Sequence, residues 1–308
     1  MTLPVLSIVC PVRSLDDPQL AEFLQSLDCQ DMPKGSYEVI LETRGNSEEA
    51  KWYGIQRARG EIIGFFCIDN VIRYSDFLRS MVQAAQAEGV TGAYTRRYAY
   101  VKKAPPLDRY FALLGANDPL CWWIGKADRE SYLSAWGTRL KHQLSLGDNG
   151  CFIKRALILQ VLPKEASQFG SCMCLCEDLR QAGHSTWTVL YSEALWHKTG
   201  ISLLSYLKRR HRYVRELYWQ RKSVRRWHMV STRQDWIRVV LFALSSLLVL
   251  PHLWLSYRGY RRVQDPAWFI HPGLCFLITC LYSWLIIEHL WRRLWSAPTS
   301  VLTAIKHW

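Results

Sequence analysis

The stretch RARGEIIGFFCIDN, residues 57–70, contains the strand from which the fold of this chain can be worked out. Its apolar run, 61–68, follows a glycine and ends at a single carboxylate, Asp69, and an amide, Asn70. A continuous apolar run of this length is typical of a strand buried on both faces of a parallel sheet. We therefore expect a buried strand whose carboxyl end presents Asp69 and Asn70.

Strands and helices alternate around this stretch. Strand-like runs at 5–12, 37–43 and within 91–101 are separated by helical patterns that begin near Asp17, Ser47 and Ser75. The alternation predicts an α/β fold with a mostly parallel sheet covered by helices. Ligands of such sheets bind outside the carboxyl ends of the strands. The residues expected at this edge are Pro11, Val12, Arg13, Glu42, Thr43, Asp69 and Asn70.

The middle of the chain is less regular. Residues 102–147 mix proline, glycine, charges and aromatic residues, which predicts either a substrate-facing insertion or irregular structure. A short strand and a helix start follow within 147–159, and a strand is expected at 186–191. The run CMCLC, 172–176, would place three thiols on one face if it were extended, and we interpret these cysteines as small buried side chains rather than as a metal or redox site.

The last third of the chain is basic and then apolar. From 206 to 238 there are eleven Lys or Arg against two acids, within a net charge of +13. The runs 239–257 and 267–287 contain no charged residue and are long enough to cross a bilayer, with tryptophan and tyrosine near their ends. We predict a transmembrane hairpin; re-entrant or interfacial helices and a buried helical pair are the alternatives, favoured by prolines and histidines in both runs.

These patterns divide the chain into four parts. We expect an α/β domain at 1–200, a basic amphipathic interfacial segment at 201–236, a membrane hairpin at 237–290 and a tail at 291–308. The N-terminus lacks the basic start of a signal peptide, so the α/β domain is expected to face the cytoplasm. The basic run adjoins the apolar runs, and for this reason we expect anionic lipid, and no nucleic acid, as its partner.

Six motifs in order resemble the family 2 glycosyltransferases of the GT-A fold. They are LSIVCPV (6–12), YEVILETRGNS (37–47), RARGEIIGFFCIDN (57–70), GDNGCFIKR (147–155), EDLRQAG (177–183) and RRHRY (209–213). The resemblance implies a nucleotide-sugar donor and a divalent cation, Mg²⁺ or Mn²⁺. Two positions depart from the family pattern: Cys67 stands at the first acid of its Asp-x-Asp motif, and Thr43-Arg44 stands at its Asp-Asp pair.

The resemblance also assigns roles to residues. Asp178, with Glu177 beside it, matches the pair that supplies the catalytic base, although acids at the start of a helix are an alternative explanation. Arg209, Arg212 and Tyr213 match a motif that binds the diphosphate, and the same stretch could instead lie on anionic lipid. Asp69 is expected to hold the cation, with His197 as a further ligand.

A donor pocket beside a basic segment and two apolar runs predicts a particular kind of enzyme. We expect an inverting, membrane-located glycosyltransferase that transfers a sugar to a lipid-linked acceptor, either a polyprenyl phosphate or a polyprenyl-diphosphate glycan. The lost acid at position 67 favours the alternative, a non-catalytic GT-A scaffold that binds nucleotide or a partner enzyme at the membrane. Nothing in the sequence indicates the oligomeric state.

Overall fold

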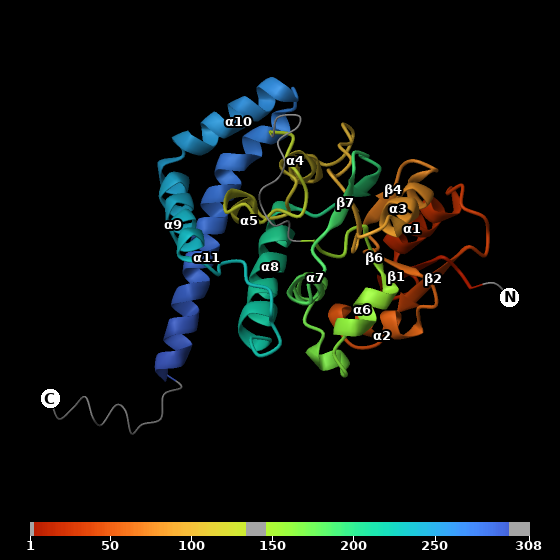
Figure 1. Cartoon of the computed structure of the whole chain (residues 1–308). Coiled ribbons are helices and arrows are strands. Elements are labelled where there is room, and N and C mark those ends of the chain that lie inside the picture. The colour runs from red at the N-terminus through yellow and green to blue at the C-terminus, as the bar shows by residue number, and fades with distance from the viewer. Residues whose placement is uncertain (1–2, 134–145, 296–308) are drawn as a thin grey trace, which may run out of the picture.

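The computed structural model describes residues 3–133 and 146–295, and its centre is a six-stranded sheet (Figure 1). The strand order is β2-β1-β3-β6-β5-β7; β6 runs against both of its neighbours and the other five strands are parallel to one another. The prediction of a mostly parallel sheet is confirmed, and the reversed β6 is an addition to it. The strands are β1 (Leu6–Pro11), β2 (Tyr37–Glu42), β3 (Ile62–Phe65), β5 (Gly92–Thr95), β6 (Cys151–Lys154) and β7 (Trp187–Leu190).

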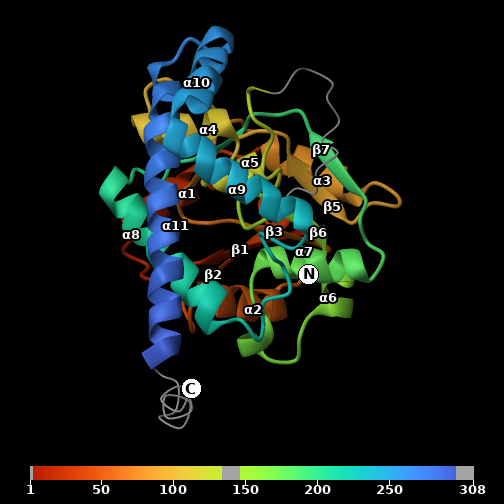
Figure 2. The same cartoon turned by 90° about the vertical axis from the view of Figure 1, so that its left-hand side faces the viewer.

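Helices cover both faces of this sheet (Figures 1 and 2). Neighbouring residues of β1 point to opposite faces: Ile8 packs with Phe23 of α1 and Phe77 of α3, whereas Val9 packs with Ile55 of α2 and with residues of α6 and α7. Each helix therefore buries one apolar face against the sheet. These helices are α1 (Pro18–Asp28), α2 (Ser47–Arg57), α3 (Phe77–Gln86), α6 (Arg155–Val161) and α7 (Cys172–Gln181); a 3₁₀ turn, η1, covers Ala166–Gln168.

The strand in the opening stretch is shorter than predicted. It ends at Phe65 rather than at residue 68, because the chain turns there: Asn70 donates its N–H to the Cys67 carbonyl at 3.0 Å, and its side-chain oxygen accepts the Cys67 N–H at 3.2 Å. The chain then forms β4 (Asn70–Ile72), which pairs antiparallel with β8 (Leu195–His197). This small second sheet brings Asp69 close to the end of β8.

The described part of the aperiodic stretch, up to residue 133, is helical rather than irregular. It contains α4 (Pro106–Leu114) and α5 (Pro119–Trp123), which pack on the C-terminal helices; the rest of that stretch up to 145 lies outside the described residues. Seven of the nine residues of α4 are buried, and its apolar residues Leu107, Tyr110, Phe111 and Leu114 follow helical spacing. In the described residues the stretch therefore acts as packing between the sheet and the C-terminal helices.

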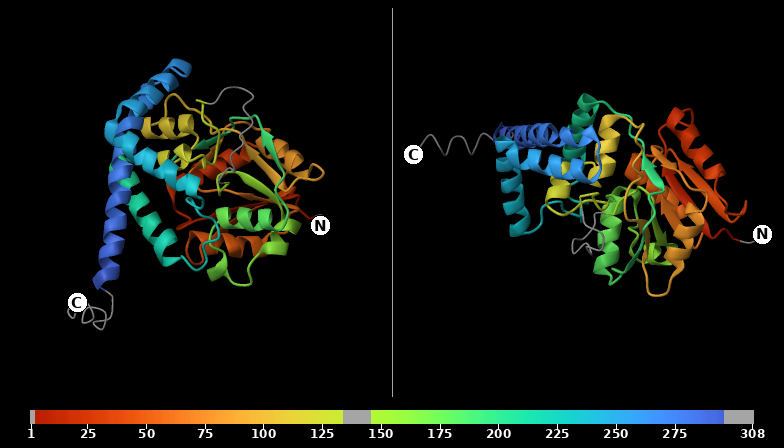
Figure 3. Two further views of the ribbon diagram at one scale, coloured as in Figure 1. Left: turned by 60° about the vertical axis from the view of Figure 1, so that its left-hand side comes forward. Right: turned by 90° about the horizontal axis from the view of Figure 1, so that it is seen from above.

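The C-terminal third forms a helical layer on one side of the sheet domain, as the view from above shows (Figure 3). The run 239–257, predicted as one straight span, is instead divided between α9 and α10, which meet at an angle of 88°. Val249, at the break, has a φ of 62°, and Pro251 follows it at the start of α10. The elements are α8 (Leu203–Tyr213), a π-helical continuation η2 (Val214–Gln220), α9 (Arg233–Leu248), α10 (Leu250–Arg262), a 3₁₀ turn η3 (Pro266–Phe269) and α11 (Ile270–Trp295).

One helical stretch among the described residues, Pro266–Arg292, has the length and apolar character of a membrane span. It includes the predicted run 267–287. The bent pair α9–α10 meets the same criteria only if its two helices count as one broken span. The structure therefore supports one continuous apolar helix and replaces the other predicted span by a bent pair.

A chain of buried polar groups joins α4, α11, α10 and α9. The Tyr110 hydroxyl lies 2.7 Å from Nδ1 of His271, Nε2 of His271 lies 3.2 Å from Nδ1 of His252, and Nε2 of His252 lies 3.2 Å from Oγ of Ser246. Cys275 lies beside the two rings, and the three ligand-type groups fall within 4.8 Å of one another. If Tyr110 donates to His271, His271 to His252 and His252 to Ser246, every ring nitrogen has a hydrogen-bond partner. The cluster is therefore explained as a set of buried hydrogen bonds that connects the helices.

Candidate active site

The carboxyl ends of β1 and β2 meet at one edge of the sheet. The Val12 N–H donates to the Glu42 carbonyl at 2.9 Å, which places Pro11 and Arg13 beside the turn after β2. The Glu42 carboxylate is 3% exposed and accepts hydrogen bonds from the Arg44 side chain at 2.7 and 2.9 Å. These hydrogen bonds lower the pKa of Glu42 to about 2.

Glu42 also receives the backbone N–H groups of Thr43 and Arg44, both at 3.1 Å, and Nη1 of Arg57 at 3.2 Å. Its carboxylate is thus largely occupied in shaping the turn. Arg44 lies over the ring of Tyr53, 4.2 Å from its centroid. The predicted donor residues Glu42 and Thr43 therefore lie at the expected edge, where the structure gives Glu42 a supporting role.

Asp69 and His197 meet where β4 pairs with β8. Oδ2 of Asp69 lies 3.2 Å from Nε2 of His197, and the Lys198 N–H donates to the Asp69 carbonyl at 2.7 Å. On the other side of the ring, Nδ1 lies 3.3 Å from the amide nitrogen of Asn117. The structure thus brings together two residues that are 128 positions apart in the sequence.

The two side chains change each other's pKa. Both are 8% exposed, and burial alone raises the pKa of Asp69 and lowers that of His197. Their mutual charge interaction reverses both effects, so the pKa of the Asp69 carboxyl is lowered and that of the His197 ring is raised. Arg209, a predicted diphosphate ligand, also acts electrostatically on both groups.

Asn70 fixes the loop that carries Asp69. Its amide nitrogen lies 3.1 Å from Oδ1 of Asn149 and 3.4 Å from Oδ1 of Asp69, and Asn149 in turn donates to the Tyr98 hydroxyl at 3.0 Å. Asn70 is fully buried. The oxygen and the nitrogen of its amide both form hydrogen bonds within the protein. Asn70 therefore holds the loop that carries Asp69 and has no free oxygen directed at a ligand.

Asp148, Lys51 and Glu48 form a charged group at the same edge that the sequence motifs did not indicate. Nζ of Lys51 lies 3.0 Å from each oxygen of Glu48 and forms a short ion pair with Oδ2 of Asp148. The turn that carries Asp148 lies against the loop that carries Cys67, since Asn70 donates a hydrogen bond to Asn149 at 3.1 Å. Asp148 belongs to the motif GDNG, but no spacing in the sequence links residue 148 to residue 67.

The Asp148 carboxylate is the most exposed member of this group. Its side chain is 29% exposed, compared with 18% for Glu48 and 1% for Lys51. Burial raises its pKa, but the charge and hydrogen bond of Lys51 outweigh this effect and bring the pKa of Asp148 down to about 2. Burial, together with the neighbouring charges of Asp148 and Asp69, raises the pKa of the Cys67 thiol well above its usual value, so Cys67 is a neutral thiol.

Glu177 and Asp178 lie on α7, as predicted, but in its second half. This position excludes the alternative that they stabilise the start of the helix. Asp178 accepts hydrogen bonds from Nε of Arg226 at 2.6 and 2.8 Å, and Glu177 pairs with Arg180 at 2.5 Å. Cys172, the first residue of α7, interacts electrostatically with Lys51 and Asp148. Asp178 lies six residues later, which is about 9 Å farther along the helix axis, so the start of α7 is nearer to the Asp148 group than Asp178 is.

The three predicted diphosphate ligands occupy different surroundings. Arg209 acts on Asp69 and His197, as described above, whereas Arg212 is 55% exposed and lies 4.0 Å from Glu216. Arg210, which was not singled out, is the more buried arginine and lies 3.7 Å from Asp118. Tyr213 is one of the residues that line the pocket described next.

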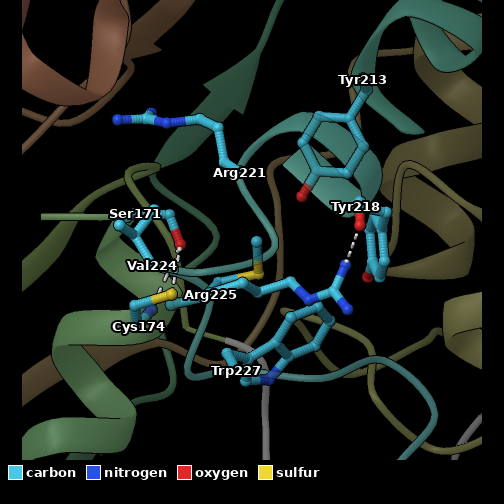
Figure 4. Close-up of a pocket in the computed structure, with 10 residues that line it drawn as sticks. Ser171, Cys174, Tyr213, Tyr218, Arg221, Val224, Arg225 and Trp227 are labelled. Carbon is cyan, nitrogen blue, oxygen red and sulfur yellow. Dashed lines mark hydrogen bonds between the residues drawn. The ribbon is translucent and has the colours of Figure 1, made fainter. Parts of the chain in front are cut away.

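This pocket lies between the start of α7 and the chain after α8 (Figure 4). The guanidinium of Arg225 stacks on the ring of Tyr218, 4.4 Å from its centroid, and Arg221 reaches Glu49 at the start of α2 at 3.8 Å. Aromatic rings and two arginines therefore border the space between α2 and α7. The lining residues are Gly170, Ser171, Met173, Cys174, Tyr213, Tyr218, Arg221, Val224, Arg225 and Trp227.

Asp69 and His197 have the geometry to hold a divalent cation. In octahedral coordination with bonds of about 2.1 Å, neighbouring ligand atoms lie about 3 Å apart. The 3.2 Å separation of Oδ2 and Nε2 fits this value. A carboxylate beside an imidazole suits a first-row transition ion such as Mn²⁺ better than Mg²⁺, which prefers oxygen ligands. The separation of these two ligand atoms thus fits such an ion.

The sequence matches no known protein family and no curated protein. Its fold, however, is similar to that of a solved glycosyltransferase, and its mostly parallel six-stranded sheet is consistent with the GT-A fold. A mannosyltransferase, PcManGT from Pyrobaculum calidifontis, solved in complex with GDP-Man and Mn²⁺, has a similar structure with a TM-score of 0.52 at 14% identity, over 94% of this chain and 88% of that one. A match over 94% of the chain extends beyond the sheet domain into the C-terminal helices.

Two further solved structures are less similar. Glucosyl-3-phosphoglycerate synthase from Mycobacterium tuberculosis, in complex with Mn²⁺, UDP-glucose and glycerol 3-phosphate, gives a TM-score of 0.42 at 16% identity over 72% of this chain and 81% of that one. TarS from S. aureus, residues 1–349, gives 0.41 at 10% identity over 94% and 91%. The argument for the fold therefore rests on the mannosyltransferase.

Proposed function

We propose that this protein is a glycosyltransferase that moves a sugar from a nucleotide-sugar donor to a lipid-linked acceptor at a membrane. The observation that carries the proposal is the Asp69–His197 pair, buried at the carboxyl edge of a GT-A sheet. A similar fold holds GDP-mannose and Mn²⁺ in the mannosyltransferase. Polyprenyl phosphates and polyprenyl-diphosphate glycans are the acceptors that the membrane features favour.

In this proposal each group at the edge has a task. Asp69 and His197 hold the divalent cation, Mn²⁺ or Mg²⁺, which supplies positive charge to the diphosphate leaving group. Arg209 adds a fixed positive charge near the same place. Asp178 stays the predicted base for the hydroxyl of a glycan acceptor, whereas an ionised polyprenyl phosphate needs no base; the Asp178 carboxylate can act only after it is released from Arg226.

An exposed apolar surface supports the membrane part of the proposal. Soluble monomers rarely expose large contiguous apolar patches, whereas α9, α10 and α11 carry large apolar side chains that are mostly more than 40% exposed. Exposed basic residues of α8 suit anionic headgroups beside such a surface. The apolar residues are Trp236, Ile237, Val240, Leu241, Leu244, Leu247, Leu248, Leu250, Leu253, Trp254, Phe276, Trp284, Ile286, Ile287, Leu290 and Trp291.

Purified protein in detergent tests the proposal when it is given a panel of UDP- and GDP-sugars, Mn²⁺ or Mg²⁺, and a lipid extract containing polyprenyl phosphates. We expect transfer of the sugar to an organic-soluble product, lost with EDTA and reduced by at least about 100-fold in Asp69→Asn. Transfer to water-soluble acceptors only would remove the lipid part of the proposal. If no nucleotide sugar gives transfer or donor hydrolysis, the proposal that the protein is an enzyme is refuted.

One observation favours the second candidate, a non-catalytic scaffold that binds nucleotide at the membrane. Position 67 lacks an acid, and the Glu42 carboxylate is occupied by two arginines and two backbone N–H groups. Binding of a nucleoside diphosphate with Mn²⁺, together with no turnover of any donor, is the result that this candidate predicts.

A further inference from the structure

Cys67 stands where the resemblance leads one to expect a carboxylate, yet a carboxylate is present beside it. Asp148, a residue 81 positions later in the turn before β6, is brought beside Cys67 because the two residues that follow it contact Asn70 and Phe65. Both Asp148 and Asp69 act electrostatically on the Cys67 thiol and on Cys10, at the end of β1. Asp148 therefore faces the same edge of the sheet as Asp69.

The chain holds the Asp148 turn against the Asp69 loop at two points. Asn70 donates to Asn149 at 3.1 Å, and the Gly150 N–H donates to the carbonyl of Phe65 at 2.8 Å. Gly150 has a φ of 68°, and a Cβ there would lie 2.7 Å from the side chain of Leu195 in β8. The turn that carries Asp148 is consequently held in place by the same strands that position Asp69 and His197.

We propose that Asp148 is the second carboxylate of the donor site and takes the place of the acid absent at position 67, with Lys51 as the residue that positions it. The proposal rests on the proposed function, since its ligand is the complex of a divalent cation with a nucleoside diphosphate. Asp148 contributes negative charge toward the cation and its bound water. Lys51 is 1% exposed and contacts both Glu48 and Asp148, so it fixes the direction of the carboxylate.

The surroundings of Asp148 suit binding rather than proton transfer. With a pKa of about 2, its carboxylate stays ionised at every pH at which the protein is assayed, and a base this weak takes a proton from a hydroxyl poorly. An ionised, partly exposed carboxylate is suited to a cation or to donor hydroxyl groups. The trio of Glu48, Lys51 and Asp148 carries one net negative charge when all three are ionised, which is the charge that an acid at position 67 would supply.

Binding of Mn²⁺ in the presence of GDP or UDP, measured by electron paramagnetic resonance of free Mn²⁺ on the full-length protein, tests the proposal without turnover. We expect Asp148→Asn to weaken Mn²⁺ binding by about tenfold or more, as loss of a supporting carboxylate does at metal sites. Cys67→Asp combined with Asp148→Asn moves the carboxylate to the neighbouring side chain and should restore binding to within about threefold of the original protein. Cys67→Ser combined with Asp148→Asn adds no charge and should bind as weakly as Asp148→Asn alone.

Two further variants keep the result interpretable. Asp148→Asn leaves the buried Lys51 with one partner fewer and could unfold the protein, so Lys51→Gln with Asp148→Asn is measured as a neutral pair and is expected to bind as weakly as Asp148→Asn. Glu38→Gln, which breaks a partly buried ion pair with Arg59 near the amino end of β2, is the control and should leave binding unchanged.

The outcomes separate this proposal from the proposed function. If the original protein binds no Mn²⁺ in the presence of GDP and none in the presence of UDP, both the proposed function and the role of Asp148 are refuted. Normal binding in the original protein together with equal binding in Asp148→Asn or in the neutral pair defeats only the role of Asp148. Loss of binding in Asp148→Asn without restoration by Cys67→Asp, in protein that is folded by circular dichroism, would also overturn the proposal, because the carboxylate would then act through Lys51 and not toward the cation.

Discussion

Replacing Gly259 by alanine tests how closely the end of α10 packs against η3, the 3₁₀ turn just before α11. A Cβ at this position would lie 2.4, 2.5 and 2.7 Å from three ring atoms of Trp268. Trp268 is 1% exposed and is packed among the helices, so its ring cannot move aside freely. We expect the overpacking to cost about 1–3 kcal/mol, reduced by about 0.5–1 kcal/mol because alanine favours a helix over glycine.

The net effect is a loss of about 1–2 kcal/mol of unfolding free energy, or roughly 2–5 °C in the melting temperature. Gly273→Ala in α11 is the matched control. No atom lies within 4 Å of a Cβ at Gly273, so the same substitution there should be neutral or stabilising by up to about 1 kcal/mol.

Thermal unfolding in detergent, followed by intrinsic tryptophan fluorescence, measures both variants under identical conditions. The expected order of stability is Gly273→Ala, the original protein, then Gly259→Ala. Equal melting temperatures for the two variants would refute the reasoning, because they would mean that Gly259 does not face Trp268.

Three other predictions address the site and the helical layer. Asp178→Asn should lower kcat by about 100-fold or more if Asp178 is the base, whereas Arg226→Gln, which frees its carboxylate, should cost about 1 kcal/mol of stability without lowering kcat; unchanged kcat in Asp178→Asn removes this assignment. Glu42→Gln should destabilise the protein at pH 7 by about 1–2 kcal/mol, and the difference from the original protein should vanish in denaturant titrations as the pH falls from about 4.5 toward 2, because the pKa of Glu42 is lowered to about 2 in the folded state. Tyr110→Phe removes the partner of His271 Nδ1 and should cost about 1–3 kcal/mol in thermal unfolding; no loss would show that the ring has another partner.

The early part of the fold could be predicted because local signals and burial agree there. Asp17 caps α1 by accepting the N–H of Gln19 at 2.9 Å, with Pro18 at the first position, as the sequence indicated. The apolar runs of β1 and β3 are buried on both faces, which is why they show no alternation. The direction of β6 is not encoded in such a pattern, since an apolar run reads the same in a parallel and an antiparallel strand.

Other features could not be predicted from a one-dimensional pattern. α4 is only nine residues long, and the C-terminal helices that bury it are not apparent from its own sequence. The break at Val249 is compatible with an unbroken apolar run, because a bent pair and a straight span have the same composition. Asp69 and His197 were both singled out, but only the pairing of β4 with β8 shows that they touch.

The acid absent from position 67 illustrates the same limit and has a physical consequence. A motif records carboxylates that are close in sequence, whereas the proposed site combines the turn at Asp69, the turn at Asp148 and the end of β8. With Asp148 already beside residue 67 and Asp69 nearby, an aspartate in place of Cys67 would bring a third negative charge into one small region. Like charges at such distances raise the pKa of at least one carboxyl group and weaken its charge. A neutral thiol at position 67 is therefore compatible with a charged donor site, and the loss of the acid at 67 is a weaker argument against an enzyme than the sequence alone suggests.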